Sequence, residues 1–198
     1  PEIGFTEHRT AGVVAEKLKE YGVDEVHTGI AGTGVVGIIK GNEGSRRVGL
    51  RADMDALPID ELTNLNYSSK TPGVMHACGH DTHVAILLAT AKIMYDLKDQ
   101  ISGKIKFIFQ PAEEGAPPGE EGGAELMVKE GVLLNPDVDA IFGLHIWSQF
   151  EAGQIYVRPE GIMAAVNEFR IDIEGVQTHG STPWTGIDPI VTASQMIN

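Results

Sequence analysis

The only cysteine of the chain lies in a short stretch that is dense in potential metal ligands. Residues 74–86 read VMHACGHDTHVAI, which places Cys78 beside His80, with Asp81 and His83 just after. A thiolate and a neutral imidazole are good ligands for Zn²⁺ and related divalent ions, and a Cys-x-His spacing lets one turn supply two donors. The stretch therefore predicts part of a metal site, with Cys78 and His80 as ligands.

Three other roles are compatible with the sequence around Cys78. An inert buried cysteine beside surface histidines is the ordinary alternative, and a Cys–His nucleophile is the second. A redox role is disfavoured, because the chain contains no other cysteine that could resolve a disulfide. The density of histidine and aspartate around this residue favours the metal site.

A pair of adjacent glutamates follows one of the most apolar runs of the chain. Glu113 and Glu114 come directly after FIFQ (107–110), a proline and an alanine. Neighbouring side chains in such a loop point in different directions, so one carboxylate can bind a metal ion while the other acts as a general base. Metal-assisted hydrolysis requires that combination. We interpret the second such pair, Glu120 and Glu121, as solvated surface.

Two aspartates and a further histidine also lie at the ends of apolar runs. Asp53 and Asp55 end the run RRVGLRAD and its extension at spacing i, i+2, so both can face the same side. One could bind a metal ion and the other could orient a ligand, although a turn-capping role fits either residue alone. His145 closes the run AIFGLH, and this position makes it a ligand candidate.

Predicted strands and helices alternate along the first part of the chain. We expect strands at 34–41, 46–53, 104–110, 140–146 and 153–159 and helices at 6–20, 82–97 and 122–131. This alternation is typical of a layered α/β domain with parallel or mixed strand pairing. Ligands of such sheets bind beyond the carboxyl ends of the strands. The sequence therefore predicts a metal centre at one edge of the sheet.

The character of the chain changes near residue 163. Residues 167–176 alternate in polarity like a half-buried strand, and a turn-rich loop and a helix pattern follow. The loop contains His179, which taken alone is an ordinary loop residue. We therefore expect a first domain over 1–163 and the beginning of a second, smaller domain over 164–198.

Composition and charge restrict the classes of partner. The net charge of −13 and the isoelectric point near 4.8 argue against nucleic acid, and no apolar run reaches the roughly 18 residues of a membrane span. A single cysteine forms no internal disulfide, so we expect a reducing, cytoplasmic location. Because the chain starts without methionine and its last helix pattern has no terminating residue, we expect an internal piece of a longer protein.

The motifs together resemble one known enzyme family. RADMDALP, MHACGHDTHVA, FIFQPAEEG, FGLH and GIDPI, in this order, closely resemble the M20 metallopeptidase/amidohydrolase family. The most similar branch is aminoacylase-like and includes hippurate hydrolases, auxin-conjugate hydrolases and N-acetyldiaminopimelate deacetylases. The resemblance covers essentially the whole chain. It implies part of a two-metal catalytic domain, followed by the start of an α+β lid or dimerisation domain.

The resemblance also implies a ligand set and its cofactors. The residues that match the metal ligands of the family are Cys78, His80, Glu114 and His145. Asp53 lies where other branches of the family carry a histidine ligand. The implied cofactors are two divalent ions, either Zn²⁺ or one of Mn²⁺, Co²⁺ and Ni²⁺.

Three further residues match the catalytic groups of the family. Glu113 matches the general base, and Asp55 matches the carboxylate near the metal ions. His179 matches the lid histidine that stabilises the oxyanion, in many members from the partner subunit. The residues around His179, QTHGSTP, differ from the GGHAA-like motif that is common at this position in the family. We expect this difference to alter the substrate pocket.

The implied activity is hydrolysis of the amide bond of N-acyl amino acids by a metal-activated water. The implied partners are this small-molecule substrate and a second copy bound through the lid. Alternatives are a dipeptidase or carboxypeptidase of the same family, a non-catalytic metal-binding member and a metal-free thiol hydrolase. The remaining histidine ligand of the family lies beyond residue 198, so we expect this chain alone to be inactive.

Overall fold

The computed structural model describes residues 1–117, 119–167 and 169–197. Contacts divide the chain into two units, Pro1–Phe150 and Glu151–Asn198. The division falls earlier in the chain than the boundary expected at residue 163. The interpretation of the second part as the start of a lid stays a prediction.

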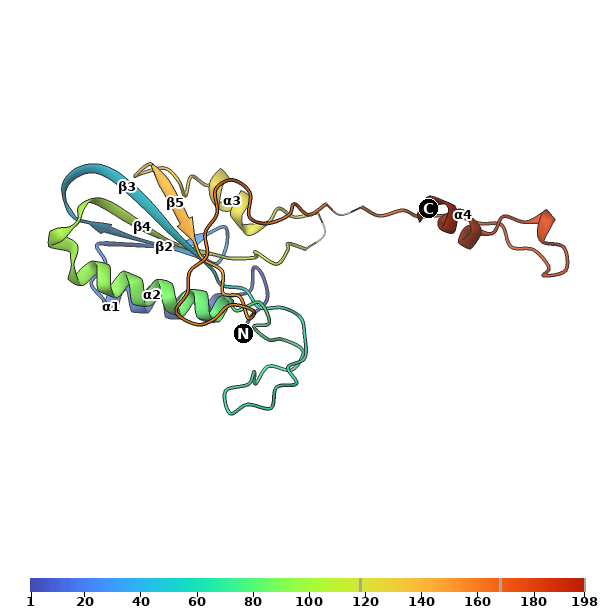
Figure 1. The fold of residues 1–198 in the computed structure, drawn as a ribbon, viewed down its shortest axis with the longest axis horizontal. Coiled ribbons are helices and arrows are strands. Elements are labelled where there is room, and N and C mark those ends of the chain that lie inside the picture. The colour runs from blue at the N-terminus through green and yellow to red at the C-terminus, as the bar shows by residue number, and fades with distance from the viewer. Residues whose placement is uncertain (118, 168, 198) are drawn as a thin grey trace. The chain divides into compact units, whose positions relative to one another are not determined.

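The first unit contains a five-stranded mixed sheet (Figure 1). Its strands are β1 (Glu25–Ile30), β2 (Gly34–Lys40), β3 (Asn42–Asp53), β4 (Ser102–Gln110) and β5 (Ala140–Gly143). Their order across the sheet is β1-β2-β4-β3-β5. β2 is antiparallel to β1 and to β4, whereas β3 is parallel to β4 and to β5. The expected α/β fold with a mixed sheet is confirmed.

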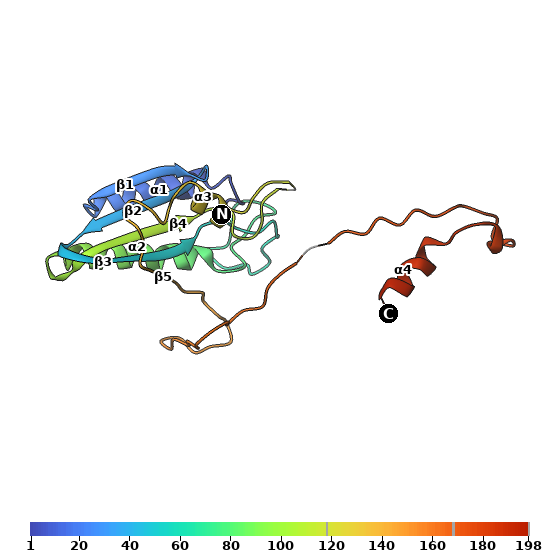
Figure 2. The ribbon, with the colours of Figure 1, turned by 90° about the horizontal axis from the view of Figure 1, so that it is seen from above.

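Helices pack against both faces of this sheet. α1 (His8–Glu20) and α2 (His80–Asp96) lie side by side on one face, and α3 (Gly123–Lys129) lies on the other (Figure 1 and Figure 2). Only one side of α2 is buried: Val84, Leu87 and Ala91 face the core, whereas Ile86 and Ile93 are exposed. Among the described residues, no helix is both long enough and apolar enough to cross a membrane.

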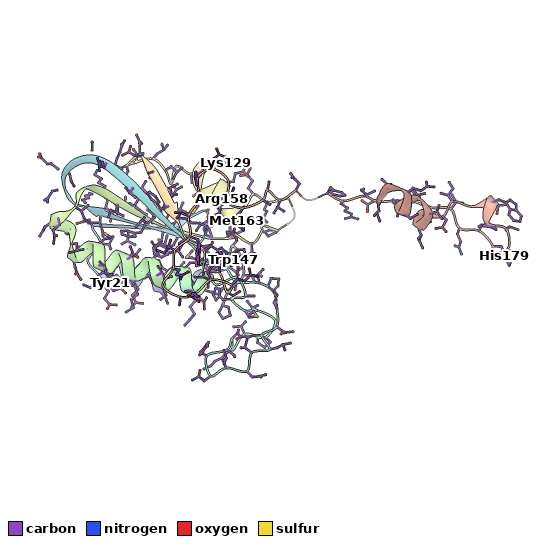
Figure 3. All side chains as sticks on the ribbon, in the orientation of Figure 1. Tyr21, Lys129, Trp147, Arg158, Met163 and His179 are labelled. Carbon is purple, nitrogen blue, oxygen red and sulfur yellow. The ribbon has the colours of Figure 1, made fainter. Side chains whose placement is uncertain are left out.

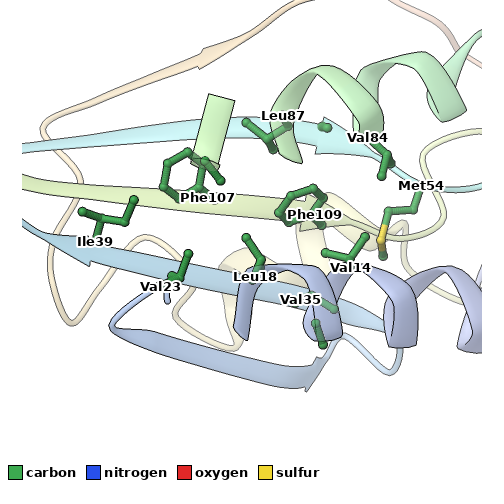
Figure 4. Packing of buried hydrophobic residues seen from close by; sticks show 13 residues of the cluster. Val14, Leu18, Val23, Val35, Ile39, Met54, Val84, Leu87, Phe107 and Phe109 are labelled. Carbon is green, nitrogen blue, oxygen red and sulfur yellow. The ribbon is translucent and has the colours of Figure 1, made fainter. Parts of the chain in front are cut away.

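The sheet has a hydrophobic core on each face, and alternate residues of β4 point into one core and then the other. Phe107 and Phe109 are fully buried against α1 and α2 (Figure 4), whereas Ile108 packs with Met127 of α3 on the opposite face. Burial of each phenylalanine contributes roughly 1.5–3 kcal/mol. A shift of β4 by one residue would turn both rings to the other face, so the cores fix the register of the strand.

Parallel pairing brings the carboxyl ends of three strands to one edge. Asp53 at the end of β3 pairs with Gln110 at the end of β4. β5 runs in the same direction beside β3 and ends at Gly143. The segments that follow these strands therefore leave the sheet together, and the start of α2 joins them through side-chain contacts of His80 and His83.

Three predictions differ from the observed elements. β1 was not expected, because its sequence EVHTGI is largely polar and it lies exposed at the edge of the sheet. Residues 153–159 form no strand. Residues 169–175, which are most of the expected strand 167–176, form none either, and residue 168 of that segment lies outside the described residues. A strand needs a partner for its main-chain groups. The described part of the second unit offers only an isolated bridge between Val176 and Ile187.

The second unit otherwise contains short helical elements. A 3₁₀ turn, Pro183–Thr185, precedes the helix α4 (Pro189–Ile197). Pro189 begins this helix, a position where the missing N–H of proline costs nothing. The helix expected at the end of the chain is therefore present.

A buried lysine anchors the segment that leads from α3 to β5. Lys106 of β4 is 3% exposed, and its Nζ donates hydrogen bonds to the carbonyl oxygens of Val132, Leu134 and Pro136 at 2.7–2.9 Å. Burial lowers the pKa of this amine. An ammonium group has three N–H donors, and each of them has a carbonyl partner here. Lys106 therefore fixes the path of the chain toward β5.

We predict that Lys106→Met lowers the free energy of unfolding by about 3 kcal/mol, because it leaves one buried and two partly buried carbonyl groups without their donor. Urea unfolding of the complete protein measures this change. Lys104→Met is the matched control, since Lys104 lies two residues away on the same strand and is exposed. Equal effects of the two substitutions would contradict the anchoring role.

Candidate metal centre

His80 is the central residue of the site. It follows Gly79, whose φ of 97° lies in the left-handed region, and it is 1% exposed. Its Nδ1 lies 2.9 Å from the carbonyl oxygen of Asp55. Because a carbonyl only accepts, Nδ1 carries the hydrogen, and in the neutral imidazole Nε2 presents its lone pair. That Nε2 is buried and has no hydrogen-bond partner among the described residues.

Three carboxylates face this nitrogen. Nε2 of His80 lies 3.7 Å from an oxygen of Glu113, 3.7 Å from one of Glu114 and 3.5 Å from one of Asp53. Asp55 holds the glutamate loop in place, because its Oδ2 accepts a hydrogen bond of 2.9 Å from the main-chain N–H of Glu114. The glutamates are therefore fixed beside an imidazole lone pair.

A thiol and a second imidazole complete the cluster. Sγ of Cys78 lies 3.2 Å from Nε2 of His145. Cys78 comes from the loop before α2, whereas His145 comes from the segment after β5. The two ligands are 67 positions apart in sequence, and only the fold brings them together.

The donor set fits a divalent cation. Three groups of side chains each place their ligand atoms within 4.8 Å of one another, and all three share His80: Cys78–His80–His145, Asp53–His80–His83 and His80–Glu113–Glu114. Sulfur, imidazole and carboxylate donors in one cluster are typical of zinc and its neighbours. The buried lone pair of His80, without a partner and surrounded by anionic groups, is the observation that a cation would explain.

The electrostatics of Cys78 distinguish between its candidate roles. Burial raises the pKa of its thiol, and the carboxylates of Glu114, Glu113 and Asp53 raise it further, to about 12. A nucleophilic cysteine needs a lowered pKa. The site without a cation therefore keeps the thiol protonated, which argues against a metal-free thiol hydrolase.

Glu113 has the electrostatics of a base. Burial raises the pKa of its carboxyl group, and the charge of Asp53 raises it further, against the opposing effects of Arg51 and His80. A carboxylate with a raised pKa accepts a proton more readily at neutral pH. The side chain is 41% exposed, so a water molecule can reach it.

Sequence reasoning noted His83 only as one of several crowded histidines. The structure shows it 2% exposed, with Nδ1 2.6 Å from Oδ1 of Asp53 and Nε2 accepting a hydrogen bond of 2.9 Å from the N–H of Ile146. Its spacing of three residues from His80, which places both on one side of a helix, was the available signal.

The remaining predicted residue, His179, lies in the second unit (Figure 3). Its Nδ1 lies 2.8 Å from Oγ of Ser181 within the same loop. The structure brings the other seven predicted residues together in the first unit. The oxyanion role of His179 stays a prediction.

In the metal-free protein we predict slow alkylation of Cys78 by iodoacetamide at pH 8, because little thiolate is present when the pKa is about 12. The rate should keep rising about tenfold per pH unit through pH 10, whereas the rate for free cysteine levels off near its pKa of about 8.5. A rate for Cys78 that levels off below pH 9 would show that the thiolate is favoured.

Known proteins are similar in sequence to this chain over its full length. Thermostable carboxypeptidase 1 of Saccharolobus solfataricus is 48% identical over an alignment of 199 residues, which covers the whole of this chain and 49% of the relative. The N-acyl-L-amino acid amidohydrolase of Geobacillus stearothermophilus is 45% identical over 197 residues, with 51% of its length covered. The chain thus spans about half the length of the curated relatives it matches.

A solved structure shares the fold. The Bacillus subtilis YXEP protein, described as a dinuclear metal binding peptidase from the M20 family, superimposes with a TM-score of 0.66 at 42% identity, over 73% of this chain and 38% of that one. Residues 49–195 match peptidase family M20/M25/M40. The resemblance expected from the motifs is confirmed: the chain belongs to the M20 peptidase family.

Proposed function

We propose that the complete protein is a metal-dependent amidohydrolase that cleaves the amide bond of N-acyl amino acids. The observation that carries this proposal is the buried, unpartnered Nε2 of His80, which faces Glu113 and Glu114 beside the Cys78–His145 pair. The name of the Geobacillus relative supports the substrate class.

We propose Cys78, His80, Glu114 and His145 as ligands of two divalent ions, with Zn²⁺ first and Mn²⁺, Co²⁺ or Ni²⁺ as alternatives. When bound, the ions supply Lewis acidity, which polarises the amide carbonyl and lowers the pKa of water. The prediction that Asp53 is a further ligand is untested, and its two carboxylate oxygens already accept hydrogen bonds from Arg51 and His83.

The protein's own groups would move the proton. Glu113 takes a proton from the attacking water and donates it to the nitrogen of the leaving amino acid, so the amide is replaced by a carboxylic acid and a free amine. Asp55 keeps His80 and the glutamate loop in position, because it accepts hydrogen bonds from both. His179 would stabilise the oxyanion. Two copies of the protein would associate through the lid, in the cytoplasm.

A second candidate is a carboxypeptidase or dipeptidase that uses the same centre. The name of the Saccharolobus relative favours it, and both reactions break a C–N bond. A non-catalytic metal-binding protein is less consistent with the site, because Glu113 is intact and has a raised pKa. Hydrolysis of N-acetyl- and N-benzoyl-amino acids, compared with that of unblocked dipeptides, distinguishes the two enzymes; faster cleavage of dipeptides would replace the amidohydrolase proposal.

For the complete protein we predict that Glu113→Gln lowers kcat at least about 100-fold and leaves metal content unchanged, because it removes the base but none of the four proposed ligands. Glu120→Gln is the matched control, since Glu120 is an exposed glutamate a few residues further along. Activity of Glu113→Gln equal to that of the control would contradict the assignment of the base.

We also predict that Cys78→Ser weakens metal binding at least about tenfold, because a hydroxyl is a much poorer ligand than a thiolate. Competition of the protein with a chromophoric chelator for Zn²⁺ measures the affinity. Apparent affinity of the wild type should rise with pH, since binding must release the thiol proton. Unchanged affinity after the substitution would remove Cys78 from the ligand set.

A further inference from the structure

We propose that Asp53 and His83 are positioning residues, which hold the segment carrying His145 against the segment carrying Cys78 and His80. The proposal rests on the proposed metal centre for its consequence, and on the side-chain contacts of the structure for its geometry. It assigns to Asp53 a role through His83 in place of direct ligation.

Asp53 is fixed from two directions. It is 1% exposed, and its Oδ2 accepts a hydrogen bond of 2.7 Å from Arg51, whose Nε in turn donates to Gln110 at 2.8 Å. Its Oδ1 lies 2.6 Å from Nδ1 of His83. Both oxygens of the carboxylate are thus already hydrogen-bonded within the protein.

The same contacts determine the tautomer of His83. Its Nε2 accepts the N–H of Ile146 at 2.9 Å and so carries no hydrogen, which leaves Nδ1 to donate to Oδ1 of Asp53 at 2.6 Å. Both ring nitrogens of His83 therefore have protein partners. No lone pair is left for a metal ion, although the residue belongs to one of the candidate ligand groups.

Ile146 is held a second time through its side chain. A Cβ atom placed on Gly79 would overlap Cδ1 and Cγ1 of Ile146, so the isoleucine lies directly over the glycine between Cys78 and His80. The residue after His145 is thereby clamped by a hydrogen bond to α2 and by packing against the turn before α2. This clamp fixes how closely Sγ of Cys78 and Nε2 of His145 approach, at 3.2 Å.

Two substitutions separate the two ends of the link. His83→Asn keeps an amide N–H within reach of Asp53 but is too short to accept the N–H of Ile146. His83→Gln reaches Ile146 but gives up the donor to Asp53. If the link to Ile146 is what matters, His83→Asn should weaken Zn²⁺ binding by about 10–100-fold, and His83→Gln should restore most of the affinity.

Amide hydrogen exchange of Ile146, followed by NMR in the metal-free complete protein, reports the clamp directly. Exchange should be faster in His83→Asn than in wild type and intermediate in His83→Gln, while Thr82→Asn, an exposed neighbour on α2, should behave like wild type. This readout holds whether or not the protein hydrolyses amides, so failure of the proposed function is distinguishable from failure of the clamp.

Two results would overturn the proposal. Wild-type metal affinity and wild-type Ile146 exchange in His83→Asn would show that the link positions nothing. A drop in the number of ions bound at saturation, equal in His83→Asn and His83→Gln, would show that His83 is itself a ligand. Retained stoichiometry with reduced affinity, together with rescue by glutamine, supports the clamp.

Discussion

Parallel pairing of β3 with β4 and with β5 is the constraint on which the candidate centre depends. It brings Asp53, the loop with Glu113 and Glu114, and the segment with His145 to one edge of the sheet. The paired phenylalanines of β4 and the buried Lys106 fix this arrangement from within the cores. Side chains that lie far apart in the sequence thus meet because the segments that carry them leave the sheet at the same edge.

The charge of the candidate centre favours a bound cation. Four carboxylates lie among three imidazoles and a thiol in a partly buried space, and the 198 residues together carry a net charge of −13. Desolvated like charges raise one another's pKa values, as the thiol of Cys78 and the carboxyl of Glu113 show. Divalent ions would offset this repulsion, so metal binding and stability of the site are expected to be coupled.

The sequence alone singled out most of the residues that meet in the candidate centre, because these side chains stand at the ends of apolar runs and the α/β alternation places such ends together. It could not reveal the clamp, since the partner of His83 is a main-chain amide 63 positions away, which leaves no mark on residue type. Strand predictions failed at 153–159 and 167–176, because polarity patterns do not report whether a pairing partner is present. The largely polar β1 was missed although it pairs with β2.

X-ray absorption at the zinc edge, on the complete protein loaded with two equivalents of Zn²⁺, tests the central claim most directly. We expect a sulfur shell at about 2.3 Å beside nitrogen and oxygen ligands at about 2.0–2.2 Å. The sulfur contribution should disappear in Cys78→Ser, because Cys78 is the single cysteine among the 198 residues. A wild-type spectrum with nitrogen and oxygen ligands alone, or a protein that retains no zinc, would contradict a metal centre built on Cys78 and His80.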